Sequence, residues 1–216
     1  MSKICHTIHQ WFNGMKKHSF PFNKQEIPKN GIYILFERGE IAHTTNRIVR
    51  IGTHTGDDQL PSRLKEHFVN ENKDRSIFRK NIGRVFLNKY KDDYLKIWEI
   101  DFKNKTNREK YGYLWDIQKE KKIEKRVTKY IRGNISFVVF QIDNKNRRLE
   151  LESKIISTVS RCDECKPSQN WFGLSSPKEK IKKGKLWLVN KLRKTPLSES
   201  DLKELKNILE NAGYSI

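Results

Sequence analysis

Long hydrophobic runs are missing from this sequence of 216 residues. No stretch approaches the roughly 20 consecutive apolar residues of a membrane-spanning helix, which excludes an integral membrane protein. The first residues, MSKICHTIHQWF, contain no extended apolar segment and no small-residue cleavage site, so we do not expect secretion. Cysteine is also scarce, and three thiols cannot form a closed set of disulfides, which fits a reducing, cytoplasmic location.

Acidic residues are outnumbered: the sequence has 26 Asp and Glu and 45 Lys and Arg, which gives a formal net charge of +19. An excess of this size favours a polyanionic partner, of which nucleic acid is the commonest and anionic lipid the second. Hydrophobic residues make up 35% of the chain and charged residues 33%, so we expect one modest core. The charge thus indicates a kind of partner and does not identify a reaction.

The order of apolar patterns predicts an α/β (α+β) fold, with a small three-stranded, mainly antiparallel sheet flanked by helices. Apolar runs at 31–37 and 47–52 predict a hairpin, and 136–142 predicts a third strand. Helical spacing of apolar residues is found over 60–69, 76–91, 107–131, 147–161, 185–193 and 198–213.

These patterns divide the chain into three parts. We expect residues 1–27 to form a loosely structured arm with one helical turn near 7–12. Residues 28–183 would form the main domain, with a basic helical insertion at about 74–132. Residues 184–216 would add a helical C-terminal appendage.

One carboxylate lies on the wrong side of a predicted helix. Glu152 is flanked by apolar residues three positions before it and three, four and seven positions after it, so it falls in the inward stripe. Burying an unpaired carboxylate is costly, and Glu152 therefore needs a cation. That cation is either a Lys or Arg in a structural salt bridge, or a hard divalent metal ion completed by water.

Five elements in one order resemble the GIY-YIG nuclease family. The two signature strands of the family resemble GIYILF (31–36) and RIG (50–52). In family members a helical Arg, a later Glu followed by two apolar residues, and an Asn in a terminal loop follow these strands in that order. The matching residues are Tyr33, Arg63 with His67 one turn later, Glu152 in LESKII, and Asn170 in QNWFG. The resemblance covers roughly residues 28–175.

The sequence departs from the family at the second signature tyrosine, where it has Arg50. Tyr33 is therefore the only phenol of the signature. His54 follows the second strand at a position where relatives often have a polar or basic side chain near the phosphate, and we include it with Arg50 among the candidate catalytic residues.

The resemblance implies a metal-dependent endonuclease that cuts double-stranded DNA to 5′-phosphate and 3′-hydroxyl ends. Glu152 would hold one Mg²⁺ or Mn²⁺, Arg63 would bind the scissile phosphate, and Tyr33 would orient or deprotonate the attacking water. His67 would share the base role or hydrogen-bond Tyr33, and Asn170 would fix Glu152 or the adjacent loop. A restriction-type role fits a compact chain with an insertion and no separate DNA-binding domain.

Two other functions remain open, and so does the oligomeric state. The replacement at Arg50 would also suit a non-catalytic DNA- or RNA-binding protein on a nuclease scaffold, and a repair nuclease would prefer branched or damaged DNA. A nuclease that makes two cuts at one site would suggest a homodimer.

Basic residues interleaved with aromatic residues over 74–91 predict a helix that could enter a DNA groove or grip phosphates. The candidate DNA-binding residues are Arg75, Arg79, Lys80 and Arg84. The alternative is a solvated helix that packs its apolar stripe on the main domain.

Cys162 and Cys165 have CxxC spacing, and Cys5, His6 and His9 could add ligands. No second CxxC or His pair follows at zinc-finger spacing, so the spacing argues against a structural zinc.

Overall fold

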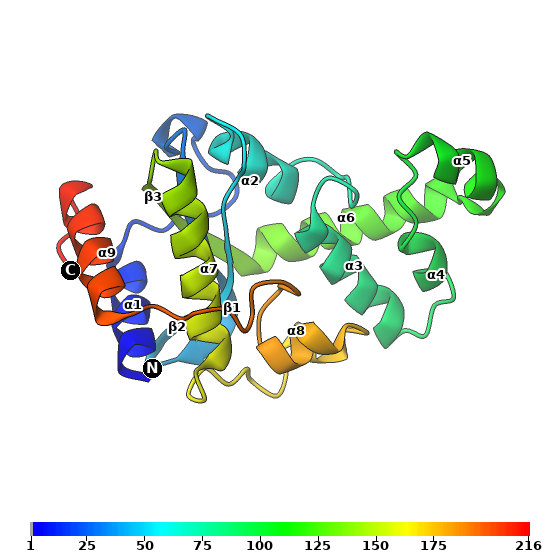
Figure 1. Cartoon of the computed structure of the whole chain (residues 1–216). Helices are drawn as coiled ribbons and strands as arrows, with labels where there is room; N and C mark the ends of the chain where they lie inside the picture. The colour runs from blue at the N-terminus through cyan, green and yellow to red at the C-terminus, as the bar shows by residue number, and fades with distance from the viewer. Residues whose placement is uncertain (1) are drawn as a thin grey trace.

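The structure, a computed structural model, describes residues 2–216 and is built on one antiparallel sheet (Figure 1). Its strands are β1 (Gly31–Ala42), β2 (Thr45–Gly52) and β3 (Ile135–Gln141), arranged in the order β2-β1-β3. The helices are α1 (Ser2–Gly14), α2 (Leu60–Phe68), α3 (Ile77–Lys89), α4 (Leu95–Trp98), α5 (Lys105–Tyr111), α6 (Ile117–Asn134), α7 (Lys145–Arg161), α8 (Glu179–Gly184) and α9 (Glu199–Asn211). Short 3-10 turns are η1 (Lys24–Glu26), η2 (Gly112–Leu114) and η3 (Phe172–Ser175). The predicted α/β fold with a small antiparallel sheet is confirmed.

The central strand β1 separates two cores, because successive side chains point to opposite faces of a sheet. Ile32 and Ile34 belong to one cluster of buried residues, and Tyr33 and Leu35 belong to the other. Both neighbouring strands are antiparallel to β1, and Tyr33 lies opposite Gly52 of β2.

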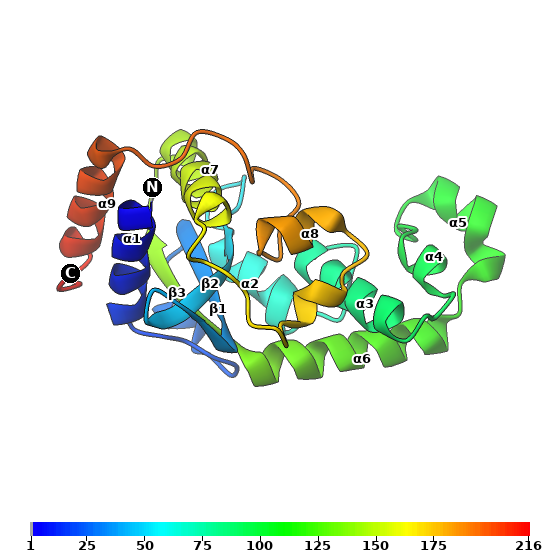
Figure 2. The ribbon, with the colours of Figure 1, turned by 90° about the horizontal axis from the view of Figure 1, so that it is seen from below.

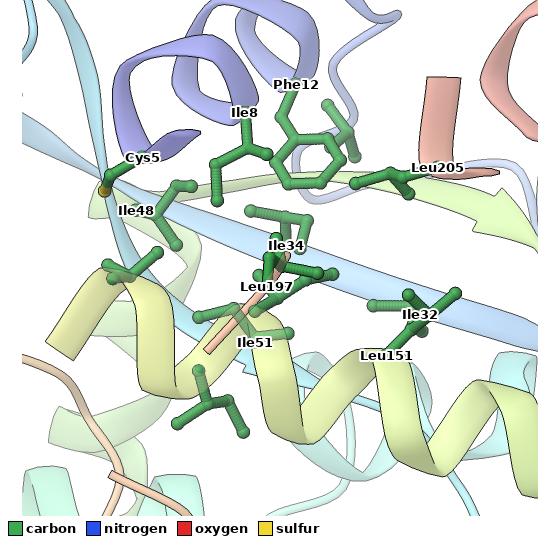
Figure 3. Packing of buried hydrophobic residues seen from close by; sticks show 14 of the residues in the cluster. Cys5, Ile8, Phe12, Ile32, Ile34, Ile48, Ile51, Leu151, Leu197 and Leu205 are labelled. Atoms are coloured by element: carbon green, nitrogen blue, oxygen red, sulfur yellow. The ribbon is translucent and has the colours of Figure 1, made fainter. Parts of the chain in front are cut away.

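The first core lies between the sheet and helices α1, α7 and α9 (Figures 1 and 2). Ile8 and Phe12 of α1 and Leu205 of α9 meet Ile34 and Leu151 in this cluster (Figure 3). The two ends of the described chain therefore come together on the same face of the sheet.

The second core lies on the other face and contains residues of α2, α3 and α6 together with three tryptophans, Trp98, Trp171 and Trp187. Helix α6 extends away from the sheet, and α4 and α5 lie at its far end in both views (Figures 1 and 2). Within residues 2–216, no helix is both long enough and apolar enough to cross a membrane.

The N-terminal segment differs from the expected loose arm. Residues 2–14 form a complete helix, and Ile4, Ile8 and Phe12 on one of its faces are buried in the first core. Polar residues between these positions obscure the period in the sequence, and tertiary packing stabilises a helix this short far more than intrinsic propensity does. Met1 lies outside the described residues.

Two expected helices also differ. The pattern over 107–131 is interrupted by η2, and α6 begins after Asp116, whose side chain accepts a hydrogen bond from the backbone N–H of Lys119. Residues 185–193 are not helical, and the backbone N–H of Trp187 instead donates to the carbonyl of Val49 in β2, at 2.8 Å. The expected C-terminal helix is α9, and its Leu205 and Leu209 are fully buried in the first core.

Truncation of Ile8 to alanine tests whether α1 is integral. The side chain is 0% exposed, so Ile8→Ala should lower the free energy of unfolding by about 2–4 kcal/mol. Lys3→Ala, on the exposed face of the same helix, should change it by less than about 0.5 kcal/mol. Urea unfolding followed by circular dichroism measures both, and equal values would contradict the packing described for α1.

Candidate active site

Three polar side chains near the end of β2 are joined by two hydrogen bonds. The hydroxyl of Tyr33 lies 2.8 Å from Nε2 of His67, and Nδ1 of His67 lies 2.7 Å from Oγ of Ser76. β1 supplies the tyrosine and α2 the histidine, while Ser76 is the N-cap residue of α3 and accepts the backbone N–H of Arg79. Tyr33 and His67 are 1% and 0% exposed, so protein atoms hold this geometry.

Two tautomers of His67 fit the hydrogen-bond network. In one, Oγ of Ser76 donates to Nδ1 and Nε2–H donates to the phenol oxygen of Tyr33. In the other, the Tyr33 hydroxyl donates to Nε2 and Nδ1–H donates to Oγ of Ser76, which also accepts the N–H of Arg79. Burial, and then the neighbouring charges of Arg63 and Arg50, lower the pKa of His67 well below its ordinary value, so the imidazole is neutral.

Arg50 occupies the place of the missing signature tyrosine and faces the same phenol. Its Nε lies 3.4 Å from the Tyr33 hydroxyl, and its Nη1 donates to the carbonyl of Trp187 at 2.5 Å. The residue is 3% exposed, and no carboxylate among residues 2–216 forms a salt bridge with it. An unpaired buried guanidinium stabilises negative charge on the atoms that it faces.

Gly52 is required by this arrangement. A Cβ atom at position 52 would come within 2.2 Å of the Tyr33 hydroxyl oxygen, well inside van der Waals contact. The glycine that ends β2 therefore leaves room for the phenol of Tyr33 on the neighbouring strand.

A pocket of about 530 Å³ lies next to Arg63, one turn before His67 on α2. It is lined by Thr53, His54, Thr55, Gln59, Ser62, Arg63, Glu66 and Arg75. The two guanidinium groups outnumber the single carboxylate, so the pocket suits an anionic ligand such as a phosphate. Arg63 is held there by donating to the carbonyl of Arg75 at 3.0 Å.

His54 lines the pocket but has both ring nitrogens engaged with the backbone. Nδ1 lies 2.6 Å from the carbonyl of Gly56, and the N–H of Gly31 donates to Nε2 at 3.4 Å. Burial lowers the pKa of His54, which keeps the ring neutral. Its observed contacts join the start of β1 to the loop after β2.

Glu152 is buried on α7, as the apolar stripe predicts, and its cation in this structure is Lys191, which forms a salt bridge with Oε2. Its other oxygen, Oε1, accepts no hydrogen bond from any residue of the described chain. No hydrogen bond joins Glu152 to Tyr33, Arg63 or His67 within residues 2–216.

The segment after α8 connects Glu152 to the phenol site. Trp187 accepts a hydrogen bond from Arg50 and Lys191 pairs with Glu152, and these two residues of the segment are four positions apart. The segment 187–191 therefore holds a partner of each group, while no hydrogen bond within residues 2–216 joins Glu152 itself to Arg50 or Tyr33. Neither Lys191 nor Ser76 was identified as a candidate from the sequence, although Ser76 has the position of a helix N-cap.

Asn170 is exposed in the loop between α7 and η3, and its side chain forms no hydrogen bond with any residue of the described range 2–216. The next residue, Trp171, is buried and donates from Nε1 to Glu37 at 3.1 Å. The structure thus does not bring Asn170 together with Glu152.

Three of the four basic residues predicted to bind DNA lie inside the protein. Arg79 is 0% exposed and bonds to Glu124 at 2.6 Å, Lys80 pairs with Asp74, and Arg84 pairs with Glu99. The prediction that Arg79, Lys80 and Arg84 bind DNA is wrong, because their charges are paired in salt bridges within the protein. Of the four, only Arg75 is exposed, with 63% of its side-chain area accessible.

The different environments of Arg79 and Arg75 predict different costs of substitution. Arg79→Ala leaves Glu124 buried without its cation and should lower the free energy of unfolding by about 3–5 kcal/mol. Arg75→Ala should change it by less than about 0.5 kcal/mol, because its salt bridge with Glu66 is largely exposed at the arginine. Urea unfolding distinguishes them, and similar losses would contradict the buried role of Arg79.

The depressed pKa of His67 predicts a dependence of stability on pH. The unfolded chain protonates this histidine near pH 6.5, while the folded protein does so only at lower pH. The unfolded state then binds more protons below pH 6.5, so the free energy of unfolding should fall as the pH drops from about 6.5. His67→Gln should be less stable at pH 7.5 but lose less on acidification to pH 5; an unchanged slope would argue against a depressed pKa for His67.

Comparison with known families agrees with the geometry. A family model described as GIY-YIG domain matches residues 2–214, which is nearly the whole chain. No curated protein and no solved structure matches the chain. The resemblance drawn from the five motif elements is confirmed, and the chain belongs to the GIY-YIG family, which implies a nuclease.

Proposed function

We propose that this chain is an endonuclease that requires a divalent metal ion and hydrolyses double-stranded DNA to 5′-phosphate and 3′-hydroxyl ends. The observation that carries the proposal is the phenol of Tyr33, whose oxygen lies within hydrogen-bond reach of Nε2 of the neutral His67 and of Nε of Arg50. When Nε2 carries the ring proton of His67, two N–H donors meet the phenol oxygen and stabilise negative charge there, which is the state in which a tyrosine takes a proton from water.

The neighbouring pocket supports the recognition of a phosphate. Arg63 lines it and offers a planar set of donors to the scissile group, and Arg75 adds a second guanidinium at its edge. The net charge of +19 would strengthen docking on the DNA backbone without reading its sequence.

Glu152 fits the binding of Mg²⁺ or Mn²⁺. Its carboxylate is a hard oxygen donor, and Oε1 is free of hydrogen bonds from residues 2–216. The ammonium group of Lys191 occupies Oε2, so Lys191 would have to move aside as the ion binds. A bound divalent ion would stabilise the developing charge on the phosphate and the leaving oxygen.

A restriction-type role remains our preferred biological context, since the chain is compact and its helical insertion is folded onto the domain. The insertion residues Phe78, Ile82 and Val127 are buried in the same core as Tyr33. The insertion would then shape the DNA channel as part of the nuclease domain.

Cleavage of supercoiled plasmid with Mg²⁺ or Mn²⁺ tests the proposal. Glu152→Gln should reduce the rate by roughly 1,000-fold, equivalent to about 4 kcal/mol of lost transition-state stabilisation. Tyr33→Phe should also reduce it strongly, because the phenol oxygen is removed and the ring is kept. Glu150→Gln is the matched control, since this exposed carboxylate lies two residues away on α7 and should leave the rate unchanged.

Three outcomes separate the alternatives. Absence of cleavage, with tight, salt-sensitive binding that neither metal nor Glu152 affects, would replace the proposal with a non-catalytic binding protein. Preference for branched over linear DNA would indicate a structure-specific repair nuclease. Sequencing of the ends would reveal a fixed target site if the role is restriction.

A further inference from the structure

All three cysteines of the chain lie together in the interior, although their spacing argued against a metal site. Cys5 comes from α1, and Cys162 and Cys165 follow the C-terminal end of α7. Cys5 lies at one edge of the first core (Figure 3). Two buried histidines, His9 of α1 and His43 in the turn between β1 and β2, face the same sulfur atoms.

The distances fit the coordination sphere of a single ion. Sγ of Cys5 lies 3.4 Å from Sγ of Cys165, and Nε2 of His43 lies 3.3 Å from Sγ of Cys165 and 3.4 Å from Sγ of Cys162. Tetrahedral zinc with Zn–S bonds of about 2.3 Å and Zn–N bonds of about 2.0–2.1 Å separates its ligand atoms by roughly 3.5–3.8 Å. A two-iron cluster would spread its ligands over two metal atoms and therefore farther apart.

The position of His43 suits a ligand. It lies in the two-residue turn between β1 and β2, where the positive φ values of His43 and Thr44, 51° and 61°, are those that such a turn requires. A carboxylate oxygen of Glu164 lies 3.2 Å from Nδ1, and Nε2 faces the sulfur atoms of Cys162 and Cys165. A carboxylate near Nδ1 favours a proton on that nitrogen, which leaves Nε2 to bind a metal.

His9 is less suited to be a ligand than Cys162. Its Nδ1 lies 2.9 Å from the carbonyl of Cys5, and its Nε2 is 3.3 Å from the N–H of Ile48, so both ring nitrogens have backbone partners. Cys162 lies against His43 and shares the CxxC segment with Cys165.

We infer that Cys5, Cys162, Cys165 and Nε2 of His43 bind one structural Zn²⁺. Three thiolates and an imidazole in a closed, buried site are typical ligands of structural zinc, while Mg²⁺ prefers oxygen donors. The ion would join α1, the β1–β2 turn and the loop after α7, segments up to 160 residues apart in the sequence. That loop leads to Trp171, so the zinc site would fix one end of the segment that continues to Lys191.

Metal analysis of the untagged full-length protein tests the inference. Inductively coupled plasma mass spectrometry should find about one zinc per chain after dialysis without chelator. Cys165→Ser and His43→Asn should lose that zinc, whereas His18→Asn, a buried histidine elsewhere in the fold, should keep it. Glu152→Gln should lose cleavage and keep the zinc, so failure of the zinc site and failure of the nuclease proposal give different results.

Cobalt substitution tests the site in the wild-type protein and distinguishes the candidate ligands by their spectra. Wild-type protein refolded with Co²⁺ should show the visible bands of tetrahedral cobalt and the near-ultraviolet charge transfer of thiolates. Cys162→Ser should weaken the charge-transfer band, and His9→Gln should leave it unchanged; the reverse result would overturn the choice of Cys162. Less than about 0.1 zinc per chain, without cobalt bands and with all three thiols reduced, would overturn the site itself.

Discussion

The structure depends on β1 as a strand that is hydrogen-bonded on both sides and buried on both faces. Its side chains alternate between two separate cores, one packed against α1, α7 and α9 and the other against α2, α3 and α6. The same alternation fixes the site, because a slip of one residue in the register would move Tyr33 away from His67 and Gly52. Folding and the candidate chemistry therefore depend on one strand register.

Buried charge holds the long segment after α7 against this strand. Glu37 of β1 accepts hydrogen bonds from Trp171 and Trp187, and burial raises the pKa of its carboxyl above the ordinary value. Glu40 pairs with the buried Arg47 and accepts from Ser168. The non-helical segment 185–194 lies along β2, where Trp187 contacts Val49 and Arg50, and Lys191 of the same segment pairs with Glu152.

A large positive charge thus has two physical roles in this protein. Part of it lies inside, where Arg47 and Arg79 pair with the buried carboxylates of Glu40 and Glu124 and Arg84 pairs with the half-buried Glu99. The remainder is available to a polyanion. Composition gives the net charge but not which cations are buried and which are exposed. A basic amphipathic helix has the same sequence pattern whether its cations face DNA or an acidic residue of a neighbouring helix.

The sequence by itself determined the family, the sheet and most of the helices around it, because these follow from local periodicity and from motifs in a fixed order. The same motifs name Tyr33, Arg63 and His67 as candidates, and the apolar spacing predicts the inward position of Glu152, which is buried. Only the tertiary structure decided that α1 is part of the core, that Lys191 pairs with Glu152, and that Cys5 and His43 meet the CxxC segment. Each of these depends on contacts between residues far apart in the chain. Such contacts stabilise the fold without producing a periodic pattern in the sequence, so the sequence pattern does not predict them.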